Sequence, residues 1–417
     1  MTYIANPVFP FPHNWDKELL ESLEWKTDIL VGETGKEQRV SRRLTPRRSF
    51  EASFLLSGSE LQFFENFMAM YGGSVMVIPL WHAVTRLTGD MVVGVSSMSV
   101  DTTFNEFTVG DLIVARGVVP SLWEAQSISS IASSSVAFST SPDMLWPIGT
   151  FVYPGVLARV EESTKVTKIT DRAGEVTVRF VLEQSTTHPS GWVPTTFAGM
   201  PVLETPTDDS DDIEMEHQRL LAMVDNAIGK RKVYDTGARQ FKTHTYRRSA
   251  AGREALLELR TMLYWLRGKA RSIWLPTFMA DMTVSAATAT GGSNLTVKNA
   301  GYVRFAMHTR HRANIRIQLW SGVVYYRTVT AVAVASESEE VLAFAQTWPV
   351  GFTPAEVARI SYLVNMRLDQ ESIEINHTTD SAGLFQCLVT WKEVDTPEIV
   401  DFTGNGGNNI NEWVAPC

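Results

Sequence analysis

The sequence predicts a mainly β protein of the α+β kind, built from two tandem copies of one antiparallel sandwich or barrel domain, with one helix in each copy. Two observations predict this. Landmarks of the first half return in the same order about 200 residues later, and apolar residues alternate with period 2 outside one amphipathic segment per copy. The chain has 417 residues, more than one hydrophobic core usually supports. We expect copies at 1–200 and 201–394, then a C-terminal extension at 395–417.

The repeat is carried by short motifs in a constant order. Pro7-Val8 returns as Pro201-Val202, a displacement of 194, and Trp146-Pro147-Ile148-Gly149 returns as Trp348-Pro349-Val350-Gly351. The segment 154–160 returns as 354–360. One match stays open, because 45–49 resembles 245–249 while the helices that follow would pair different residues. The ordered motifs indicate one ancestral domain written twice.

Helices and strands are expected at corresponding places in the two copies. Amphipathic segments at 59–71 and 254–268 predict the helices. Each is followed by an apolar run that contains a proline, which indicates a strand that ends there or lies at an edge (75–81 and 272–278). Strands at 178–183 and 387–392 should close the copies. The acidic stretch Thr205 to Glu216 is the expected linker, with a short helix after it around Met215 to Ile228.

Composition excludes several broad classes. The formal net charge of -9 disfavours a general nucleic-acid binder, which needs a cationic face. The two cysteines, Cys387 and Cys417, cannot build a disulfide framework or a four-cysteine metal site. The N-terminal sequence lacks the pattern of a secretion signal, and no apolar run reaches about 18 residues. We therefore expect a soluble protein that is not exported by the usual route.

No motif for catalysis, cofactor binding or metal binding stands out. The chain has neither a Gly-Xaa-Ser-Xaa-Gly elbow nor a phosphate-binding glycine loop. The close histidine pair, His308 and His311, has a spacing unlike that of a zinc helix or finger. Neighbouring carboxylates such as Glu161-Glu162 are typical of surface charge, and adjacency in sequence does not place two carboxyls across a cleft. The predictions are no enzyme, no catalytic residues, no cofactor and no metal.

A basic cluster near the start of the chain is the one candidate site. On strands its side chains would project cations from an otherwise acidic chain, either as a solvated or salt-bridged strand or as a subunit contact with carboxylates of a neighbouring protomer. Contact with DNA is a distant third reading. The residues of this candidate subunit interface are Arg39, Arg42, Arg43, Arg47 and Arg48.

The first part of the chain resembles tail proteins of tailed bacteriophages and prophages. The resemblance lies in Glu24 to Leu30, continues through Glu37-Gln38-Arg39 to Thr45 to Phe50, and is strongest over residues 7 to 85. The helix, glycine and Trp/Pro strand that follow are similar to the distal tail, or tail-tip ring, proteins of long flexible-tailed phages. That family has a sandwich or split-barrel core with a lateral helix.

The resemblance implies a structural virion protein that forms a ring at the distal end of the tail, assembled in the host cytoplasm. Its partners would be other copies of itself, the tail tube protein, and the tail hub with the receptor-binding proteins, with no membrane and with DNA only passing through the lumen. A duplicated domain allows three chains to present six similar domains, or six chains to build a thicker ring.

Two other functions compete with the ring. A carbohydrate- or receptor-binding module would use exposed aromatic rings, and the candidates are Trp123, Trp146, Trp192, Trp320 and Trp348. The favoured alternative places these rings in the core or in an interface. A cell-wall enzyme is the third candidate, and no motif supports it.

Overall fold

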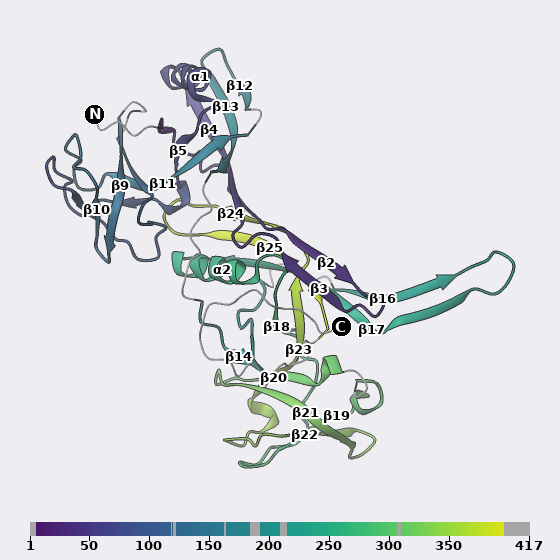
Figure 1. The fold of residues 1–417 in the computed structure, drawn as a ribbon. Helices are drawn as coiled ribbons and strands as arrows, with labels where there is room; N and C mark the ends of the chain where they lie inside the picture. The colour runs from purple at the N-terminus through teal and green to yellow at the C-terminus, as the bar shows by residue number, and fades with distance from the viewer. Residues whose placement is uncertain are drawn as a thin grey trace. The chain divides into compact units, whose positions relative to one another are not determined.

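The computed structural model describes residues 6–117, 119, 122–161, 164–183, 192–208, 215–306 and 310–395. The fold is mainly β with antiparallel sheets, as the sequence predicts. The chain divides into two compact units (Figure 1). Among the described residues, unit 1 comprises those of 6–193, 204–273 and 365–394, and unit 2 comprises those of 194–203 and 274–364 with residue 395.

The units are assembled differently from the predicted copies. Unit 1 contains the whole of the first predicted copy up to residue 193 together with two segments of the second. The boundary between the units falls within β18 (Ser272–Pro276) and within β23 (Val357–Leu368). The limits at 200 and 394 describe repeated sequence and stay a prediction. The expected extension lies outside the described residues from 396 onward.

Unit 1 is built on one long antiparallel sheet to which both halves of the chain contribute. Its strand order is β16-β17-β25-β24-β1-β4-β13-β12. These strands are β1 (Leu19–Glu24), β4 (Arg47–Ser57), β12 (Lys165–Lys168), β13 (Ala173–Leu182), β16 (Met215–Val224), β17 (Lys232–Ala250), β24 (Ser372–His377) and β25 (Phe385–Glu393).

The remaining elements of unit 1 lie between these strands in the sequence. They are the hairpin β2 (Thr27–Val31) and β3 (Glu37–Ser41), then β5 (Met76–Pro79), the 3-10 turn Trp81–Ala83, β6 (Thr85–Arg86), β7 (Ser97–Ser99), β8 (Leu112–Arg116), β9 (Trp123–Ala132), β10 (Ser135–Phe138) and β11 (Phe151–Val160). Strand β11 pairs with β13 at one end and with β5 and β8 along its length.

The two predicted helices are confirmed as α1 (Ser59–Tyr71) and α2 (Arg253–Leu266). Helix α1 buries Leu61, Phe64 and Phe67 against an aromatic core around Phe9. The Phe9 ring meets those of Phe11, Phe54, Phe64, Phe67, Trp81 and Phe180, with centroids 5.0 to 6.4 Å apart. Edge-to-face packing of this kind adds to the burial of apolar area. The proline-containing strands are confirmed as β5 and β18.

The helix expected around Met215 to Ile228 is wrong, because this segment forms β16 of a long hairpin with β17. Residues such as Leu221 and Met223 have good helix propensity, but propensity is a weak prior that pairing with a neighbouring strand overrides. Beyond Leu220 the hairpin projects as a two-stranded arm (Figure 1). We call residues 221 to 235 the arm; all of them are exposed.

Unit 2 is a smaller antiparallel unit. Within it β20 pairs with β21 and β23, β22 pairs with β19 and β21, and the tryptophans Trp274 and Trp348 are buried. Its elements besides β18 and β23 are β14 (Thr196–Phe197), β15 (Met200–Pro201), β19 (Asn294–Lys298), a π turn (Tyr302–Ala306), β20 (Asn314–Leu319), β21 (Val324–Val334), β22 (Glu339–Phe344) and two 3-10 turns (Arg310–Arg312, Pro354–Glu356).

Candidate functional site

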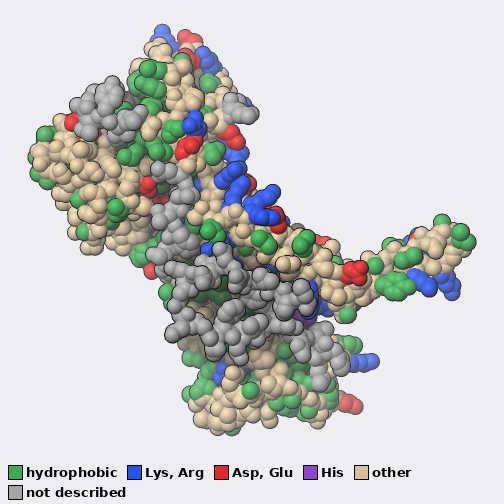
Figure 2. All heavy atoms as spheres, viewed as in Figure 1, with side chains coloured by type: hydrophobic (Ala, Val, Ile, Leu, Met, Phe, Trp, Pro, Cys, Tyr) green, Lys and Arg blue, Asp and Glu red, His purple; other side chains and the backbone are tan. Residues whose placement is uncertain are grey.

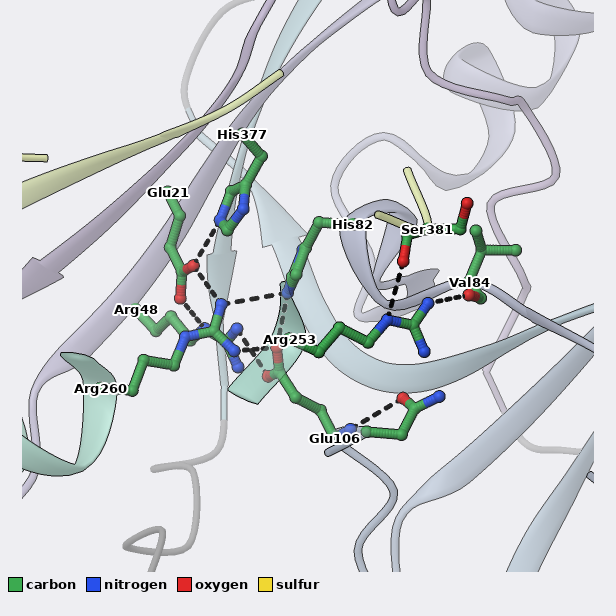
Figure 3. A network of polar contacts seen from close by, with 10 residues as sticks. Glu21, Arg48, His82, Val84, Glu106, Arg253, Arg260, His377 and Ser381 are labelled. Atoms are coloured by element: carbon green, nitrogen blue, oxygen red, sulfur yellow. Dashed lines mark hydrogen bonds and ion pairs between the residues drawn. The ribbon is translucent and has the colours of Figure 1, made fainter. Parts of the chain in front are cut away.

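The most unusual chemistry in unit 1 is a buried cluster of charged and imidazole side chains around β1. We call it the junction cluster, because β1 lies between β24 of the second half and β4 of the first. Its members are Glu21, Arg48, His82, Glu106, Arg260 and His377 (Figure 3). They come from β1, β4, the 3-10 turn, the loop before β8, α2 and β24.

Glu21 is at the centre of the junction cluster and is fully buried. Arg48 Nε donates to Glu21 Oε1 over 2.5 Å, and Arg260 Nη2 donates to the other carboxylate oxygen. His377 Nε2 lies 2.8 Å from the same Oε2. An ionised carboxylate only accepts, so the imidazole Nε2 carries the proton. Both oxygens of Glu21 are therefore held by donors from β4, α2 and β24.

Glu106 is the second carboxylate of the cluster and is partly exposed. Arg48 Nη2 lies 2.7 Å from Glu106 Oε2, and Arg260 Nη1 donates to Oε1. His82 Nε2 lies 2.5 Å from Glu106 Oε1. Two guanidinium groups thus face two carboxylates, and the formal charge balances when both histidines are neutral.

Electrostatics keep the cluster in that state. Burial opposes ionisation of Glu21, but Arg260, Arg48 and His377 outweigh it and hold the pKa of the carboxyl well below its usual value. Burial, the neighbouring His377 and Arg260 lower the pKa of His82. Burial also lowers the pKa of His377, although its bond to Glu21 opposes this. Both imidazoles are neutral, and their rings stack with centroids 4.3 Å apart.

Glu21, His82 and His377 place ligand atoms within 4.8 Å of one another, which is a spacing that a metal ion could use. Here the two oxygens of Glu21 already bind two guanidinium groups, and Arg260 Nη2 lies 3.0 Å from His82 Nε2. A divalent cation would have to displace both cations from a buried site. The arrangement is that of a structural ion-pair network.

A second feature of unit 1 is a pocket of about 560 Å³ beside the cluster. Arg86 and Arg253 line it together with Asp101 and Asp380, so its cations and anions are matched in number. Arg253 is the first residue of α2; its Nε donates to Ser381 O over 3.1 Å and its Nη2 donates to Val84 O (Figure 3). The guanidinium therefore ties α2 to segments from both halves of the chain.

The structure places the five predicted arginines in two environments. Arg42 forms an exposed ion pair with Asp28, Arg43 forms a partly exposed pair with Glu24, and Arg39 lies 4.0 Å from Glu37. Arg48 is buried in the junction cluster, whereas Arg47 is exposed. In-chain carboxylates thus meet four of the five, as the salt-bridged reading expects. The subunit contact stays a prediction for the five arginines, of which Arg42 and Arg47 are the most exposed.

Sequence reasoning missed the other members of the cluster, although two left a signal. Glu21 lies between Leu19 and Leu23 on the same buried face of β1. Arg260 lies on the buried face of α2, four residues after Leu256. A charged residue on an apolar face requires a buried partner. The partners themselves are far away in the sequence.

The tryptophans do not form an exposed group. Trp146 and Trp348 are buried, Trp123 and Trp192 are half-buried, and Trp320 is exposed. Trp192 packs against Trp265, with ring centroids 5.4 Å apart. A sugar-stacking platform made from several of these rings is therefore not favoured.

Of the close histidine pair noted in the sequence, His308 lies outside the described residues.

No known protein family matches the chain, and no curated protein matches it. Within the described residues, the helices are too short or too polar to cross a lipid bilayer.

Proposed function

We propose that this protein is a structural subunit that assembles with copies of itself into a ring at the distal end of a phage tail, joining the tail tube to the tail-tip hub and the receptor-binding proteins. It acts through the surfaces it offers to neighbours rather than through an active site. The observation that carries the assembly part is the edge-to-edge join made by β1 inside one chain.

The registers of two long hairpins support a duplicated domain. In the first half β1 and β2 run out and β3 and β4 return; in the second half β16 runs out and β17 returns. In both hairpins the pairing register between the outgoing and returning strands shifts by three residues at the equivalent position. A displacement of 194 converts the pairs Glu24↔Arg47 and Thr27↔Ser41 into the pairs Gln218↔Phe241 and Leu221↔Asp235.

The elements after the hairpins also correspond. The N-cap of α1 is Gly58 and the N-cap of α2 is Gly252, again 194 apart. The returning strand pairs with the closing strand in each half, β4 with β13 and β17 with β25. Parallel bridges join Val8 to Val77 and Val202 to Trp274. Two halves that share register, caps and partners favour two copies of a sandwich or split-barrel domain with a lateral helix.

Under this proposed correspondence, Arg48 does not match Arg248. Arg48 lies 11 positions before the first residue of α1, whereas Arg248 lies five before that of α2. The position that corresponds to Arg48 is Lys242, not Arg248. The likeness of 45–49 to 245–249 is therefore a coincidence of sequence under this register.

Within the chain, the two copies share one sheet. Strand β1 of the first copy pairs with β24 of the second along six residues, from Leu19↔His377 to Glu24↔Ser372. The corresponding strands are β16 in the second copy and β12 in the first. In the described part of the chain, β16 pairs only with β17 and β12 only with β13. A sheet that ends in such edges is a template for pairing with another chain.

The position in a virion is supported by the resemblance of residues 7 to 85 to tail-tip ring proteins, while the geometry supports the assembly. A join between unlike edges is heterologous, and heterologous joins close into rings when the rotation permits. Three chains with two copies each would present six domains, matching a sixfold tube to a threefold hub.

The first test is the mass of the purified protein in solution. We expect trimers or hexamers by light scattering at micromolar concentration. Electron microscopy of virions labelled on this chain should place it between tube and hub. A stable monomer at these concentrations, or a label elsewhere than the tail tip, would contradict the proposal.

A further inference from the structure

We infer that neighbouring chains join by antiparallel pairing of the β12 edge of one chain with the β16 edge of the next, while the arm of the second chain lies on the β2–β3 hairpin of the first. The partner is a second copy of this chain. This inference rests on the proposed ring and specifies its contacts.

The register of the contact follows from the join already present inside the chain. Leu56 and Ala250 correspond, being 194 apart, and they pair with Gly174 and Phe385. Gly174 and Phe385 therefore occupy equivalent positions in the two copies. Gly174 pairs with Lys168 and Phe385 pairs with His377, so Lys168 and His377 are equivalent as well. The in-chain pairs Glu21↔Ile375 and Ser22↔Glu374 then convert to Met215↔Val166 and Glu216↔Lys165.

The chemistry of the converted pairs fits. Met215 and Val166 are both exposed apolar side chains, with exposed fractions of 37% and 39%, and pairing would cover both. Glu216 and Lys165 carry opposite charges, and opposite charges directly across two strands stabilise a sheet. A register shifted by one residue would face Glu216 with Val166 and lose both contacts.

The arm supplies an independent observation, because one face of its counterpart in the first copy is already half-buried within the chain. One face of the β2–β3 hairpin, which includes Ile29 and Arg39, is half-buried against the rest of the unit. A Cβ added at Gly35 in its turn would lie 2.6 Å from Phe241 Cζ and 2.8 Å from Leu220 Cδ1. Glu37 binds Arg367 through two bonds of 2.6 and 2.7 Å. The hairpin of the first copy thus lies against the base of the second copy's arm.

The corresponding face of the arm is exposed and apolar. The displacement of 194 converts Thr27, Ile29 and Arg39 into Leu221, Met223 and Val233. Their exposed fractions are 55%, 60% and 55%. Figure 2 shows hydrophobic side chains on this projecting hairpin among charged ones. The counterpart of this face in the first copy is half-buried. The three apolar side chains on the arm are therefore the surface that we assign to a neighbouring chain, where they would lie on its β2–β3 hairpin.

The edge contact is tested by a disulfide or short bismaleimide bridge between cysteines at directly opposed positions. Lys165→Cys with Glu216→Cys should link chains into covalent ladders that end at the ring size. The matched control is Lys168→Cys with Glu216→Cys, because position 168 lies about 10 Å along the strand and faces the other side of the sheet. Cys417 is replaced by Ser, and Cys387 stays because it is buried and its pKa is raised to about 12.

The arm contact is tested by two aspartates on opposite faces of the same strand. Met223→Asp should weaken assembly at least tenfold in the concentration for half dissociation. Val224→Asp, whose side chain is 49% exposed on the other face, should change it less than twofold. Both positions are exposed, so the circular dichroism and thermal midpoint of the subunit should stay those of the unchanged protein.

Failure of this inference is distinguishable from failure of the proposed ring. A protein that assembles, yet gives equal cross-linking in both cysteine pairs and equal effects of both aspartates, overturns the inferred contact and leaves the ring. A protein that stays monomeric in every form overturns both. Selective cross-linking together with selective loss at Met223 supports the contact.

Discussion

Replacing Glu21 by Gln is expected to lower the free energy of unfolding by about 3–5 kcal/mol, the usual cost of removing one partner from a buried ion-pair network. Glu21 is fully buried and accepts from Arg48, Arg260 and His377. The amide keeps the shape but leaves the two guanidinium groups with one carboxylate between them. Urea unfolding followed by circular dichroism measures the change.

The matched control is Glu24→Gln on the same strand. Glu24 forms a partly exposed pair with Arg43 at 3.1 Å, and surface pairs contribute less than about 1 kcal/mol. Adding Arg260→Gln to Glu21→Gln should cost less than the two single changes together, because the second change removes a cation that the first left unpaired. A Glu21→Gln protein within 1 kcal/mol of the unchanged one would show that the cluster does not hold the junction.

Elements defined by local pattern were predictable from the sequence. The spacing of Leu61, Phe64 and Phe67 gives α1 because that period places them on one helix face, and the residues that follow the helix form the expected proline-containing strand. The segment around Leu221 failed because its composition suits a helix and only the pairing with β17 makes it a strand. Local propensity carries no information about which strand a segment pairs with.

The junction cluster was beyond a local reading for the same reason. Strand β1 pairs with residues about 350 positions later in the chain, and Arg260 reaches Glu21 from a helix in the other half. The sequence indicates that Glu21 is a charged residue on an apolar face, but it does not indicate which cationic side chain pairs with it. For the arginine candidates, the sequence likewise could not separate Arg48, which is buried, from its neighbour Arg47, which is exposed.

Acid is expected to destabilise the protein steeply between about pH 6.5 and pH 4. Burial lowers the pKa of His13 and His244 to about 4, and burial with neighbouring charges lowers those of His82 and His377. In this window the histidines are protonated in the unfolded chain but not in the folded protein, so stability falls as pH falls. His13 and His244, whose pKa is lowered to about 4, each contribute about 1.4 kcal/mol per pH unit, or about 2.8 together. His82 and His377 add to the loss in the same direction. Glu21, whose pKa is depressed, adds to the loss below about pH 4.3, where the unfolded carboxyl takes up its proton. Urea midpoints at pH 7.5, 6.0 and 5.0 measure the slope, and equal midpoints would contradict it.

His244→Phe isolates one histidine from this sum. His244 is buried, and neither of its ring nitrogens has a hydrogen-bond partner among the described residues, so Phe removes a proton acceptor without breaking a bond. Stability at pH 7.5 should change by less than about 1.5 kcal/mol, the usual cost of a swap that conserves volume. Below pH 6 the variant should lose about 1.4 kcal/mol less per pH unit than the unchanged protein, because its unfolded state binds one proton fewer. An unchanged slope would mean that His244 is protonated in the folded protein, which its burial beside Lys242 and His217 opposes.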